Sequence, residues 1–494
     1  MKLHYTISLI PTLRLFALAI IVALTTVACG SKNTSPSPNG EADEQSASGV
    51  VDLKQIKDKG KLVVLIENSS TSYHVYKGEP MGYEYELLKL FTEHIGVGLD
   101  IMLIDDMDNV FDLLNAGEVD LVAANLTVTK ERSKYVRFTE PFLYTKQVLV
   151  QKVPDNWHEL SLEVRTDTMV LSPIELVGKE VHVRKNSSFY SRLKSLSDEI
   201  GGEIDIVEVS GDVETEELIR KVAYGEIQYT VADENVAMIN KTYYPRIHVS
   251  TAISFPQKIA FAVRKSSPQL AEEINNWLLT HGQSLAITHL QNKYFKSSKS
   301  HYLRKASDYS SLSGSRISPY DHLFEEYSKI AGWDWRLIAA QAYKESRFEH
   351  NAVSWAGAFG VMQLMPTTAE QYGVDSLSSP RHNIRAGVLY LSWLDKHWES
   401  IIEDEEERVK FSLASYNVGL GHVIDARNLA AKYDHDPFIW DDNVEKFLKL
   451  KSNPKYFNDP VVKHGYCRGA EPVNYVRDIL ELYGHYSKIN QEEI

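Results

Sequence analysis

Cysteine is scarce in this chain, which has 494 residues and two cysteines, Cys29 and Cys467. Two cysteines cannot build the disulfide framework that stabilises many small exported domains. The sequence also lacks an HExxH motif, a paired Cys-x-x-Cys, and any Walker-type or dinucleotide-binding glycine pattern. We therefore expect no metal site and no cofactor, and we interpret Cys467 as a small packed residue.

Positive charge is also in short supply. Lys and Arg number 53 against 67 Asp and Glu, which gives a formal net charge of -14, and no long basic run occurs. This balance argues against a nucleic-acid binder, because such proteins need a basic surface that displaces phosphate counterions. The length exceeds the roughly 250–300 residues at which a single core stops growing, so we expect at least two domains.

The N-terminus carries the apolar run LFALAIIVALTTVA, residues 15–28, behind Lys2 and Arg14. The run is shorter than the about 20 apolar residues of a membrane-spanning helix, and it predicts a signal peptide over residues 1–28. The segment TTVAC resembles a bacterial lipobox, although Thr26 stands where leucine is usual. It predicts a lipid anchor on Cys29, with simple secretion as the alternative. Gly30 lacks the Asp associated with inner-membrane retention, so we expect the periplasmic face of the outer membrane.

Two polar stretches divide the rest of the chain. Residues 29–50 are rich in Ser, Pro, Asn and Gly and predict a tether, and residues 298–317 predict a linker. Between them, residues 51–297 alternate β-rich runs such as KLVVLIE with helical patterns such as EYELLKLFTEHIG. This order predicts an α/β domain with a mostly parallel sheet. Residues 318–494 show mainly helix-period segments and predict an all-α domain. We expect the acidic run 403–407 to be a solvated loop.

Polar side chains follow an apolar run in the segment NLTVTKER. Asn125 and Thr127 offer hydrogen-bonding groups just after the predicted strand, and Arg132 can form a bidentate pair with a carboxylate. Small ligands of α/β sheets bind at such strand ends. Taken alone, an arginine at this place more often forms a surface ion pair.

A second polar group stands before a predicted helix in RKNSSFYSRL. The N–H groups and hydroxyls of Ser187 and Ser188 can receive an anion there, although a Ser-Ser pair is more often only a helix cap. Asp233, in YTVADENVA, offers an acceptor for an amine. Together the segments predict a small-ligand site.

Residues 58–297 resemble the family-3 periplasmic solute-binding proteins, which bind polar amino acids. The segments that carry the resemblance are GYEYELLKLFTEHIG, GEVDLVAANLTVTKERSKYVRFTEPF, GKEVHVRKNSS and LAEEINNWLLTHGQSLAITHLQNKYF. The resemblance implies two α/β lobes with the ligand between them. Arg132 would hold the ligand α-carboxylate, Thr127 and Ser188 would add hydrogen bonds, and Asp233 would face the α-amine. The alternative is a lobe pair kept for docking only.

A carboxylate lies on the apolar stripe of the segment WRLIAAQAYKES. Ile338, Ala342 and Glu345 fall at i, i+4 and i+7, on one face of a helix. Desolvation and the negative end of the helix dipole both favour the protonated form of Glu345. A glutamic acid protonated near neutral pH can act as a general acid. The alternative is a surface ion pair with Lys344 or Arg347.

Residues 318–494 resemble the catalytic domain of lytic transglycosylases related to goose-type lysozyme. The matching segments are KESRFEHNAVSWAGAFGVMQLMPTTA, NIRAGVLYLSWL, LASYNVGLGHV and EPVNYVRDIL. The order of the two domains resembles the F type of membrane-bound lytic murein transglycosylases. The resemblance implies that Glu345 is a single catalytic acid/base. It would protonate the glycosidic oxygen between N-acetylmuramic acid and N-acetylglucosamine, then take the proton of the muramic C6 hydroxyl, giving a 1,6-anhydro sugar.

The resemblance also assigns substrate-binding roles. Ser354 and Gln363 would hydrogen-bond sugar substituents, and Met362 would pack on the sugar and the loop. Tyr416 would direct its phenol toward Glu345 or the substrate.

Two further positions match the family with less certainty of role. Tyr475 is matched, although a helical tyrosine of this kind is more often a core residue. Glu471 matches a position that supports the site, but Pro472 follows it where threonine is usual, which leaves its reach open.

These observations predict an exported, lipid-anchored lytic transglycosylase that acts on peptidoglycan strands. An amino acid or muropeptide bound to the first domain would regulate it. Two alternatives remain. One is a solute-binding protein whose C-terminal domain only grips peptidoglycan, and the other is a hydrolytic lysozyme that releases reducing sugar ends.

Overall fold

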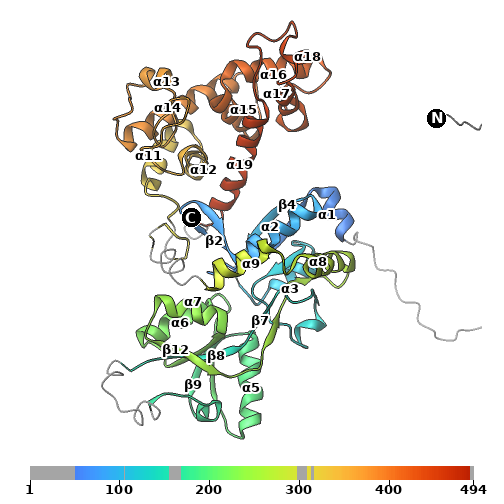
Figure 1. Ribbon diagram of the computed structural model, residues 1–494, viewed down its shortest axis with the longest axis vertical. Coiled ribbons are helices and arrows are strands. Elements are labelled where there is room, and N and C mark those ends of the chain that lie inside the picture. The colour runs from blue at the N-terminus through green and yellow to red at the C-terminus, as the bar shows by residue number, and fades with distance from the viewer. Residues whose placement is uncertain are drawn as a thin grey trace, which may run out of the picture. The chain divides into compact units, whose positions relative to one another are not determined.

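The computed structural model describes residues 51–104, 106–154, 168–296, 307, 309–312 and 316–489 (Figure 1). The predicted signal peptide, the Cys29 lipidation site and the tether lie outside the described residues, as does most of the predicted linker. None of the described helices is both long and apolar enough to cross a membrane.

The first α/β lobe is built on a five-stranded sheet in the order β4-β1-β5-β14-β6. Its strands are β1 (Lys61–Ile66), β4 (Gly98–Leu103), β5 (Leu121–Ala123), β6 (Arg137–Phe138) and β14 (Ala262–Val263). Its helices are α1 (Leu53–Lys59), α2 (Tyr83–Ile95), α3 (Val110–Ala116), α8 (Pro268–His281) and α9 (Leu285–Gln291). Strand β1 is an apolar run buried along most of its length, as expected for a central parallel strand covered on both faces.

The second lobe has its own five-stranded sheet in the order β10-β9-β11-β8-β12. Its strands are β8 (Gln147–Lys152), β9 (Glu180–Arg184), β10 (Asp205–Val209), β11 (Tyr229–Asp233) and β12 (Ile247–Ala252). Its helices are α5 (Ser188–Ile200), α6 (Thr215–Tyr224) and α7 (Glu234–Tyr243). The α/β prediction is confirmed for both lobes.

The expectation of a mostly parallel sheet is wrong, since each sheet combines two parallel and two antiparallel pairings. The antiparallel strands lie where the chain enters or leaves a lobe. Between the lobes, β7 (Leu143–Thr145) and β13 (Gln257–Ile259) pair antiparallel as the chain crosses over and returns. The parallel strands of each sheet therefore belong to βαβ units. The antiparallel strands belong to the segments that run between the lobes.

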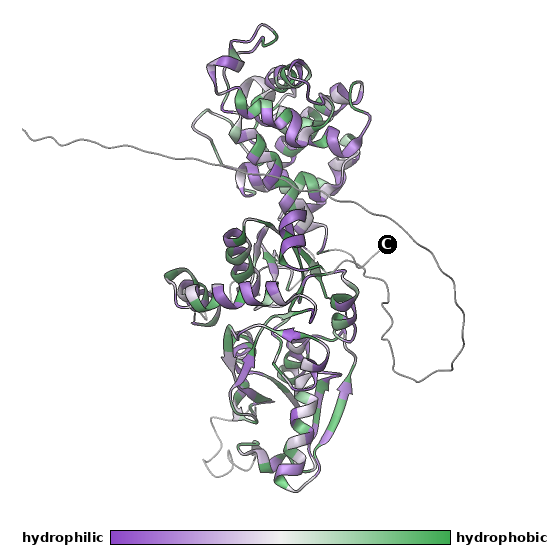
Figure 2. Cartoon of the chain, turned by 90° about the vertical axis from the view of Figure 1, so that its right-hand side faces the viewer, coloured by the Kyte–Doolittle hydropathy of each residue, from purple (hydrophilic) through white to green (hydrophobic). Residues whose placement is uncertain are grey.

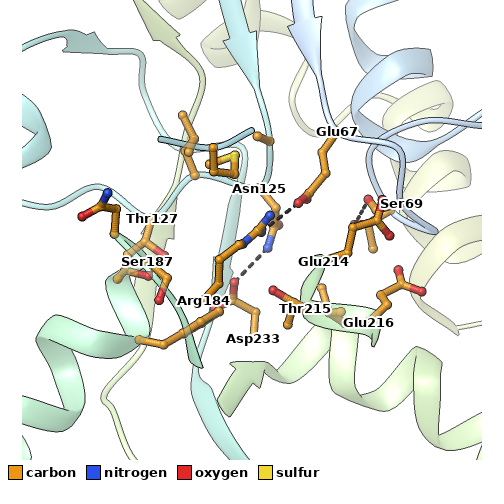
Figure 3. Close-up of a pocket in the computed structure, with 18 of the residues that line it drawn as sticks. Glu67, Ser69, Asn125, Thr127, Arg184, Ser187, Glu214, Thr215, Glu216 and Asp233 are labelled. Carbon is orange, nitrogen blue, oxygen red and sulfur yellow. Dashed lines mark hydrogen bonds and ion pairs between the residues drawn. The ribbon is translucent and has the colours of Figure 1, made fainter. Parts of the chain in front are cut away.

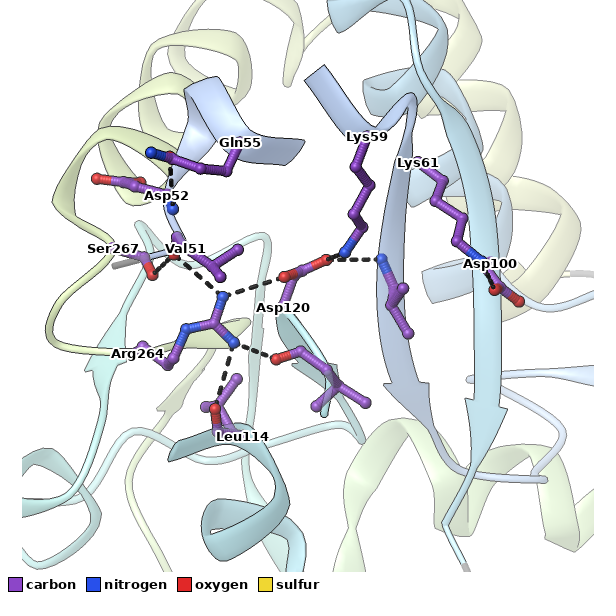
Figure 4. A network of polar contacts seen from close by, with 12 residues as sticks. Val51, Asp52, Gln55, Lys59, Lys61, Asp100, Leu114, Asp120, Arg264 and Ser267 are labelled. Atoms are coloured by element: carbon purple, nitrogen blue, oxygen red, sulfur yellow. Dashed lines mark hydrogen bonds and ion pairs between the residues drawn. The ribbon is translucent and has the colours of Figure 1, made fainter. Parts of the chain in front are cut away.

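A buried polar network ties the first lobe together (Figure 4). The guanidinium of Arg264, 5% exposed, donates to Asp120 Oδ1 at 3.0 Å and to the Leu114 and Val119 carbonyls. Asp120 Oδ2 also accepts from Lys59 Nζ at 2.7 Å and from the Val63 N–H at 3.0 Å. The network thus joins α1, β1 and the segments that flank α3 and β14.

The C-terminal part is all-α in the residues that the structure describes, as predicted. Its longer helices are α11 (Asp321–Ala331), α12 (Trp335–Ser346), α14 (Pro380–Glu399), α15 (Glu405–Val418), α16 (Leu420–Lys432) and α19 (Ala470–Tyr486). The shorter ones are α13 (Pro366–Gln371), α17 (Glu445–Leu450) and α18 (Pro454–Phe457). Along these helices hydrophobic and hydrophilic stretches alternate (Figure 2), as amphipathic helices around a core require.

The acidic run 403–407 is not a loop, which corrects the sequence expectation. Residues 405–407 form the first turn of α15, and the Asp404 side chain caps it by accepting the Glu407 N–H at 3.0 Å. Negative charge is favourable at the positive end of the helix dipole. The run therefore starts a helix.

Candidate active site and ligand pocket

Glu345 lies in the last turn of α12, where α12 packs against α19. The Tyr475 hydroxyl, on α19, donates a hydrogen bond to Glu345 Oε1. Burial raises the pKa of Glu345 to about 7, while the Tyr475 hydrogen bond and the Lys344 charge act in the lowering direction. Lys344 pairs with Asp478 at 2.6 Å. Among the described residues, Glu345 therefore does not form the surface ion pair with Lys344 that was the alternative.

Tyr416, on α15, is the second tyrosine near this carboxyl group. Its hydroxyl donates to the Met362 carbonyl at 2.7 Å, and burial together with the charge of Glu345 raises its pKa. Tyr475, not Tyr416, is therefore the tyrosine that hydrogen-bonds Glu345. Both tyrosines therefore lie near Glu345, Tyr475 as its hydrogen-bond donor and Tyr416 close enough to sense its charge.

The loop after α12 is shaped by left-handed backbone. Gly360 has φ 81°, and a Cβ there would come within 2.3 Å of the Asn383 amide. Asn383, on α14, accepts the Met362 N–H at 2.8 Å and donates to the Phe359 carbonyl at 3.2 Å. Sequence reasoning missed this anchor, although Asn383 opens the quoted segment NIRAG. A buried asparagine thus fixes the loop beside the acid.

The predicted sugar contacts occupy different places in this loop. Ser354 Oγ accepts the Ala358 N–H at 3.0 Å, and Gln363 Nε2 donates to the Ala352 and Gly360 carbonyls at 3.0 and 2.9 Å. Both side chains are partly exposed. The Gln363 amide nitrogen therefore holds the loop and leaves the amide oxygen for other partners.

Two of the residues predicted to bind substrate, Met362 and Glu471, do not lie in the partly exposed part of this loop. The Met362 side chain is fully buried, close to Gly387 of α14, so it supports the loop from within the domain. Glu471, in the first turn of α19, is exposed and pairs with Arg468 at 3.6 Å. The structure does not bring Glu471 into contact with Glu345.

The raised pKa of Glu345 gives a prediction on the pH dependence of catalysis. An acid that must be protonated to act loses activity as pH rises through its pKa. We expect the cleavage rate to fall above pH about 7, approaching about tenfold per pH unit. Tyr475→Phe removes a hydrogen bond that favours the carboxylate. It should therefore raise the pKa of Glu345 and shift the fall in cleavage rate to higher pH.

Initial rates of murein solubilisation against pH would check this. The control is Tyr483→Phe, on the same helix, whose hydroxyl bonds Asp334 at 3.1 Å. If the rate of Tyr475→Phe falls at the same pH as that of the wild type, or if the control shifts equally, Glu345 is not the titrating acid.

The second candidate site is a cavity lined by residues of both α/β lobes (Figure 3). All six residues predicted for the ligand line it: Asn125, Thr127, Arg132, Ser187, Ser188 and Asp233. They come together because β5 and β11 end at this cleft and α5 begins there, with Ser187 as its N-cap. Strand ends and helix starts are where α/β folds bind ligands.

Contacts inside the cavity cross from one lobe to the other. Asn125 Nδ2 donates to Asp233 Oδ2 at 2.8 Å, and the Ser188 hydroxyl donates to Thr127 Oγ1 at 3.2 Å. The second carboxylate oxygen of Asp233 is buried without a hydrogen-bond partner in the residues described. Burial raises the pKa of Asp233 to about 7 even though the Arg132 charge acts in the lowering direction.

Arg132 donates to the Thr127 carbonyl at 3.2 Å. Burial and the neighbouring charge of Arg184 lower its pKa to about 10. Arg132 and Asp233 influence each other's pKa but do not form an ion pair within the described part of the chain. Because they do not pair with each other, the Arg132 guanidinium and the Asp233 carboxyl group both remain at the wall of the cavity.

Sequence reasoning missed a second pair in the cavity. Arg184, at the end of β9, pairs with Glu67, just after β1, at 2.8 Å across the cleft (Figure 3). The side chains are 11% and 12% exposed. Both residues end apolar strands quoted above, and charged residues at strand ends in an α/β fold were the available signal.

No group of three or more His, Cys, Asp or Glu side chains within the described ranges is placed to hold a metal ion. Cys467 is buried, as expected for a packed residue.

Two family models match separate parts of the chain. Residues 62–297 match bacterial extracellular solute-binding proteins, family 3, and residues 322–439 match the transglycosylase SLT domain. Among solved structures, an ancestral arginine-binding protein bound to arginine is 23% identical, with a TM-score of 0.40 over 48% of this chain and 98% of that chain.

Two curated relatives match nearly the whole chain. A membrane-bound lytic murein transglycosylase F of Desulfosudis oleivorans is 36% identical over 87% of this chain and 91% of its own length. One of Pseudomonas putida (strain W619) is 31% identical over 90% of this chain and 88% of its own length. The chain therefore belongs to the family of membrane-bound lytic murein transglycosylase F, enzymes that act on peptidoglycan and carry a solute-binding domain.

Proposed function

We propose that the enzyme cleaves the β-1,4 bond between N-acetylmuramic acid and N-acetylglucosamine without water, leaving 1,6-anhydro ends. The observation that supports this is a lone catalytic carboxyl group. Burial, the Tyr475 hydrogen bond and the Lys344 charge shift the pKa of Glu345, and no carboxylate of the described residues contributes to that shift. Glycosidases that use water need a second carboxylate, roughly 5–5.5 or 6.5–9.5 Å away. A single acid suits an internal nucleophile, the sugar's own C6 hydroxyl.

Glu345 would perform both proton transfers. Protonated at the start, it gives its proton to the glycosidic oxygen as the bond from that oxygen to C1 breaks. The resulting carboxylate then accepts the C6 hydroxyl proton while O6 bonds to C1. The Tyr475 hydroxyl donates to Glu345 and so stabilises the carboxylate between the two transfers.

The remaining residues of the site would hold the sugar and the loop. We assign the Ser354 hydroxyl and the free Gln363 amide oxygen to sugar substituents, because both side chains are partly exposed. Tyr416 and Met362 would keep the loop in place through the hydrogen bond at 2.7 Å from the Tyr416 hydroxyl to the Met362 carbonyl. Glu471 would contribute only at the rim, since it is exposed.

Borohydride reduction of the products tests this reaction. An anhydro end has no free aldehyde, so digested murein should show no increase in reducible sugar ends, while soluble fragments accumulate. A rise in reducible muramic ends that matches the fragments released would instead identify a hydrolase.

The solute-binding module is proposed to bind a small ligand, an amino acid or a muropeptide, that regulates cleavage. Arg132 would hold its carboxylate and Asp233 its amine, which is supported by the unpartnered buried oxygen of Asp233. Helix α19 offers a physical connection, because it carries Tyr475 and, near its other end, His485. The His485 ring bonds the Tyr73 hydroxyl of the first lobe at 3.0 Å.

Regulation requires that the ligand favour one of two states of the enzyme. Arg132→Ala should therefore abolish the effect of ligand on the cleavage rate while leaving the rate without ligand unchanged. Equal responses to ligand in wild type and variant would remove the regulatory part of the proposal.

Ligand binding is predicted to tighten as pH rises toward neutrality. Asp233 must be ionised to pair with an ammonium group, and burial raises its pKa to about 7. Below that pH a proton must be lost on binding, so affinity should fall by up to about tenfold per pH unit. Calorimetric titrations over roughly pH 5.5 to 8, the range around a pKa near 7, would check it. In Asp233→Asn the dependence should vanish.

We also propose that residues 51–297 and 318–494 are the two domains and that a lipid on Cys29 anchors the protein at the periplasmic face of the outer membrane. The relatives named membrane-bound support membrane association. Cys29→Ser should release the protein into the soluble periplasmic fraction. Recovery of the wild type in the inner membrane would contradict the placement.

A further inference from the structure

A group of aromatic side chains adjoins Tyr416, and the reaction proposed above does not use it. Tyr390 and Trp393 lie on α14, and Tyr372 directly follows α13. The centroid of the Tyr390 ring is 5.1 Å from that of Tyr416. The ring centroids of Trp393 and Tyr372 lie 6.0 and 6.4 Å from that of Tyr390. We call Tyr372, Tyr390 and Trp393 the aromatic row.

The aromatic row leads from the surroundings of Glu345 to the protein surface. The charges of Glu345, Tyr390 and Tyr372 all act to raise the pKa of Tyr416, so the row begins close to the carboxyl group. Tyr372 and Tyr390 are partly exposed, and Trp393 is 52% exposed. A molecule bound at Glu345 can therefore continue along the row.

The two residues of the row on α14 present their rings in nearly the same orientation. Tyr390 and Trp393 are three residues apart, which places them on one face of the helix, and the angle between their ring planes is 15°. A tryptophan with half of its surface in water gives little to the core of its own domain. Such side chains are enriched where a partner covers the ring.

The row also offers polar groups that the protein leaves free. Neither the Tyr372 hydroxyl nor the Tyr390 hydroxyl forms a hydrogen bond with another residue in the described part of the chain. A phenol can donate one hydrogen bond and accept others. Both hydroxyls are therefore available to the same ligand that would cover the Trp393 ring.

Flat rings combined with free hydroxyls suit a neutral sugar. A pyranose has apolar C–H groups on its faces and hydroxyl or acetamido groups at its edges, so rings can cover the face while phenols bond the edge. The row itself contains no charged side chain, which favours the sugars of peptidoglycan over its stem peptides with their carboxylates. The strand is a polymer, so sugars beyond the cleaved bond need a surface beside Glu345.

We propose that the aromatic row is a sugar-binding subsite for the glycan strand. Trp393 stacks on the face of an N-acetyl sugar further along the strand from the cleaved bond, and the Tyr372 and Tyr390 hydroxyls bond the substituents of the same region. This inference rests on the proposed role of Glu345 as the catalytic acid and adds residues that hold the substrate.

Binding of a peptide-free oligosaccharide to the full-length Glu345→Gln protein tests the subsite without cleavage. The probe is chitohexaose, an oligomer of N-acetylglucosamine, and isothermal titration measures its affinity. Adding Trp393→Ala should weaken binding about tenfold, and adding Tyr390→Phe about threefold, through loss of one hydrogen bond. Trp393→Phe keeps an aromatic face and should retain most of the affinity.

The control is Phe438→Ala, because Phe438 is a similarly exposed aromatic residue, at 46%, of the same domain. It should bind chitohexaose as tightly as Glu345→Gln alone, and unchanged circular dichroism would show that each variant is folded. With Glu345 intact, Trp393→Ala should raise KM for murein strands and leave kcat unchanged, as expected for lost substrate binding.

The outcomes separate this inference from the function on which it rests. Equal affinities with and without Trp393→Ala, or no binding of chitohexaose to Glu345→Gln, would refute the subsite. A higher KM on intact murein that returns to normal on peptide-free strands would also refute it and assign the row to the stem peptide. If Glu345→Gln still cleaves murein while Trp393→Ala loses chitohexaose, the catalytic acid is wrong and the sugar subsite stands.

Discussion

Glu345→Gln is expected to abolish glycan cleavage while leaving the protein folded. Glutamine keeps the shape of the side chain but can neither give a proton to the glycosidic oxygen nor accept one from the C6 hydroxyl. General acid–base catalysis contributes roughly 10²–10⁴-fold, and because one residue serves both transfers the loss should fall near the top of that range. Release of soluble fragments from purified murein measures the rate.

The same measurement needs a matched control. Glu349→Gln changes an exposed glutamate four residues further along, in the loop after α12, and should leave the rate unchanged. Substantial cleavage by Glu345→Gln would mean that another group supplies the proton. Wall binding by both variants, without cleavage by either or by the wild type, would favour the binding-protein alternative.

Arg264→Met is expected to give the largest loss of stability. It removes a buried guanidinium from Asp120 and with it the hydrogen bonds from Arg264 to the Leu114 and Val119 carbonyls. Removing one partner of a buried ion pair costs about 3–5 kcal/mol. The lower end is expected, about 3 kcal/mol, because Lys59 still pairs with Asp120 at 2.7 Å.

Urea denaturation followed by circular dichroism would measure the change in the free energy of unfolding. Lys61→Met is the control, since Lys61 pairs with Asp100 at 2.9 Å in the same region (Figure 4) with both side chains well exposed, 53% and 39%. An exposed pair contributes at most about 1 kcal/mol. Equal effects of the two substitutions would show that the buried network does not carry the stability of the first lobe.

Periodicity predicted that Glu345 lies on the apolar stripe near the end of its helix, but by itself it left a surface ion pair open as the alternative. It could not identify the tyrosine that bonds it, because Tyr475 lies 130 residues away and the choice between two tyrosines depends on how α12, α15 and α19 pack. Tyr416 turned out to donate to the Met362 carbonyl instead. Contacts between distant helices are set by tertiary packing, which a local pattern does not contain.

The ligand pocket was predicted more completely, since strand ends and helix starts of an α/β fold gather at one cleft. Each of the six predicted residues lines the cavity. The Arg184–Glu67 pair was missed because its members are 117 residues apart and belong to different lobes. The antiparallel strands of the two sheets were missed for a similar reason. Their direction depends on where the chain crosses between the lobes and where it returns, which a local pattern does not contain.

The central claim is that cleavage proceeds without water. The most direct measurement is mass spectrometry of the fragments released from purified murein in water enriched in ¹⁸O, with Glu345→Gln as the blank. The account predicts 1,6-anhydromuramic fragments, one water lighter than their reducing counterparts and free of ¹⁸O. Reducing muramic ends that carry ¹⁸O at C1 would contradict it and identify a hydrolase.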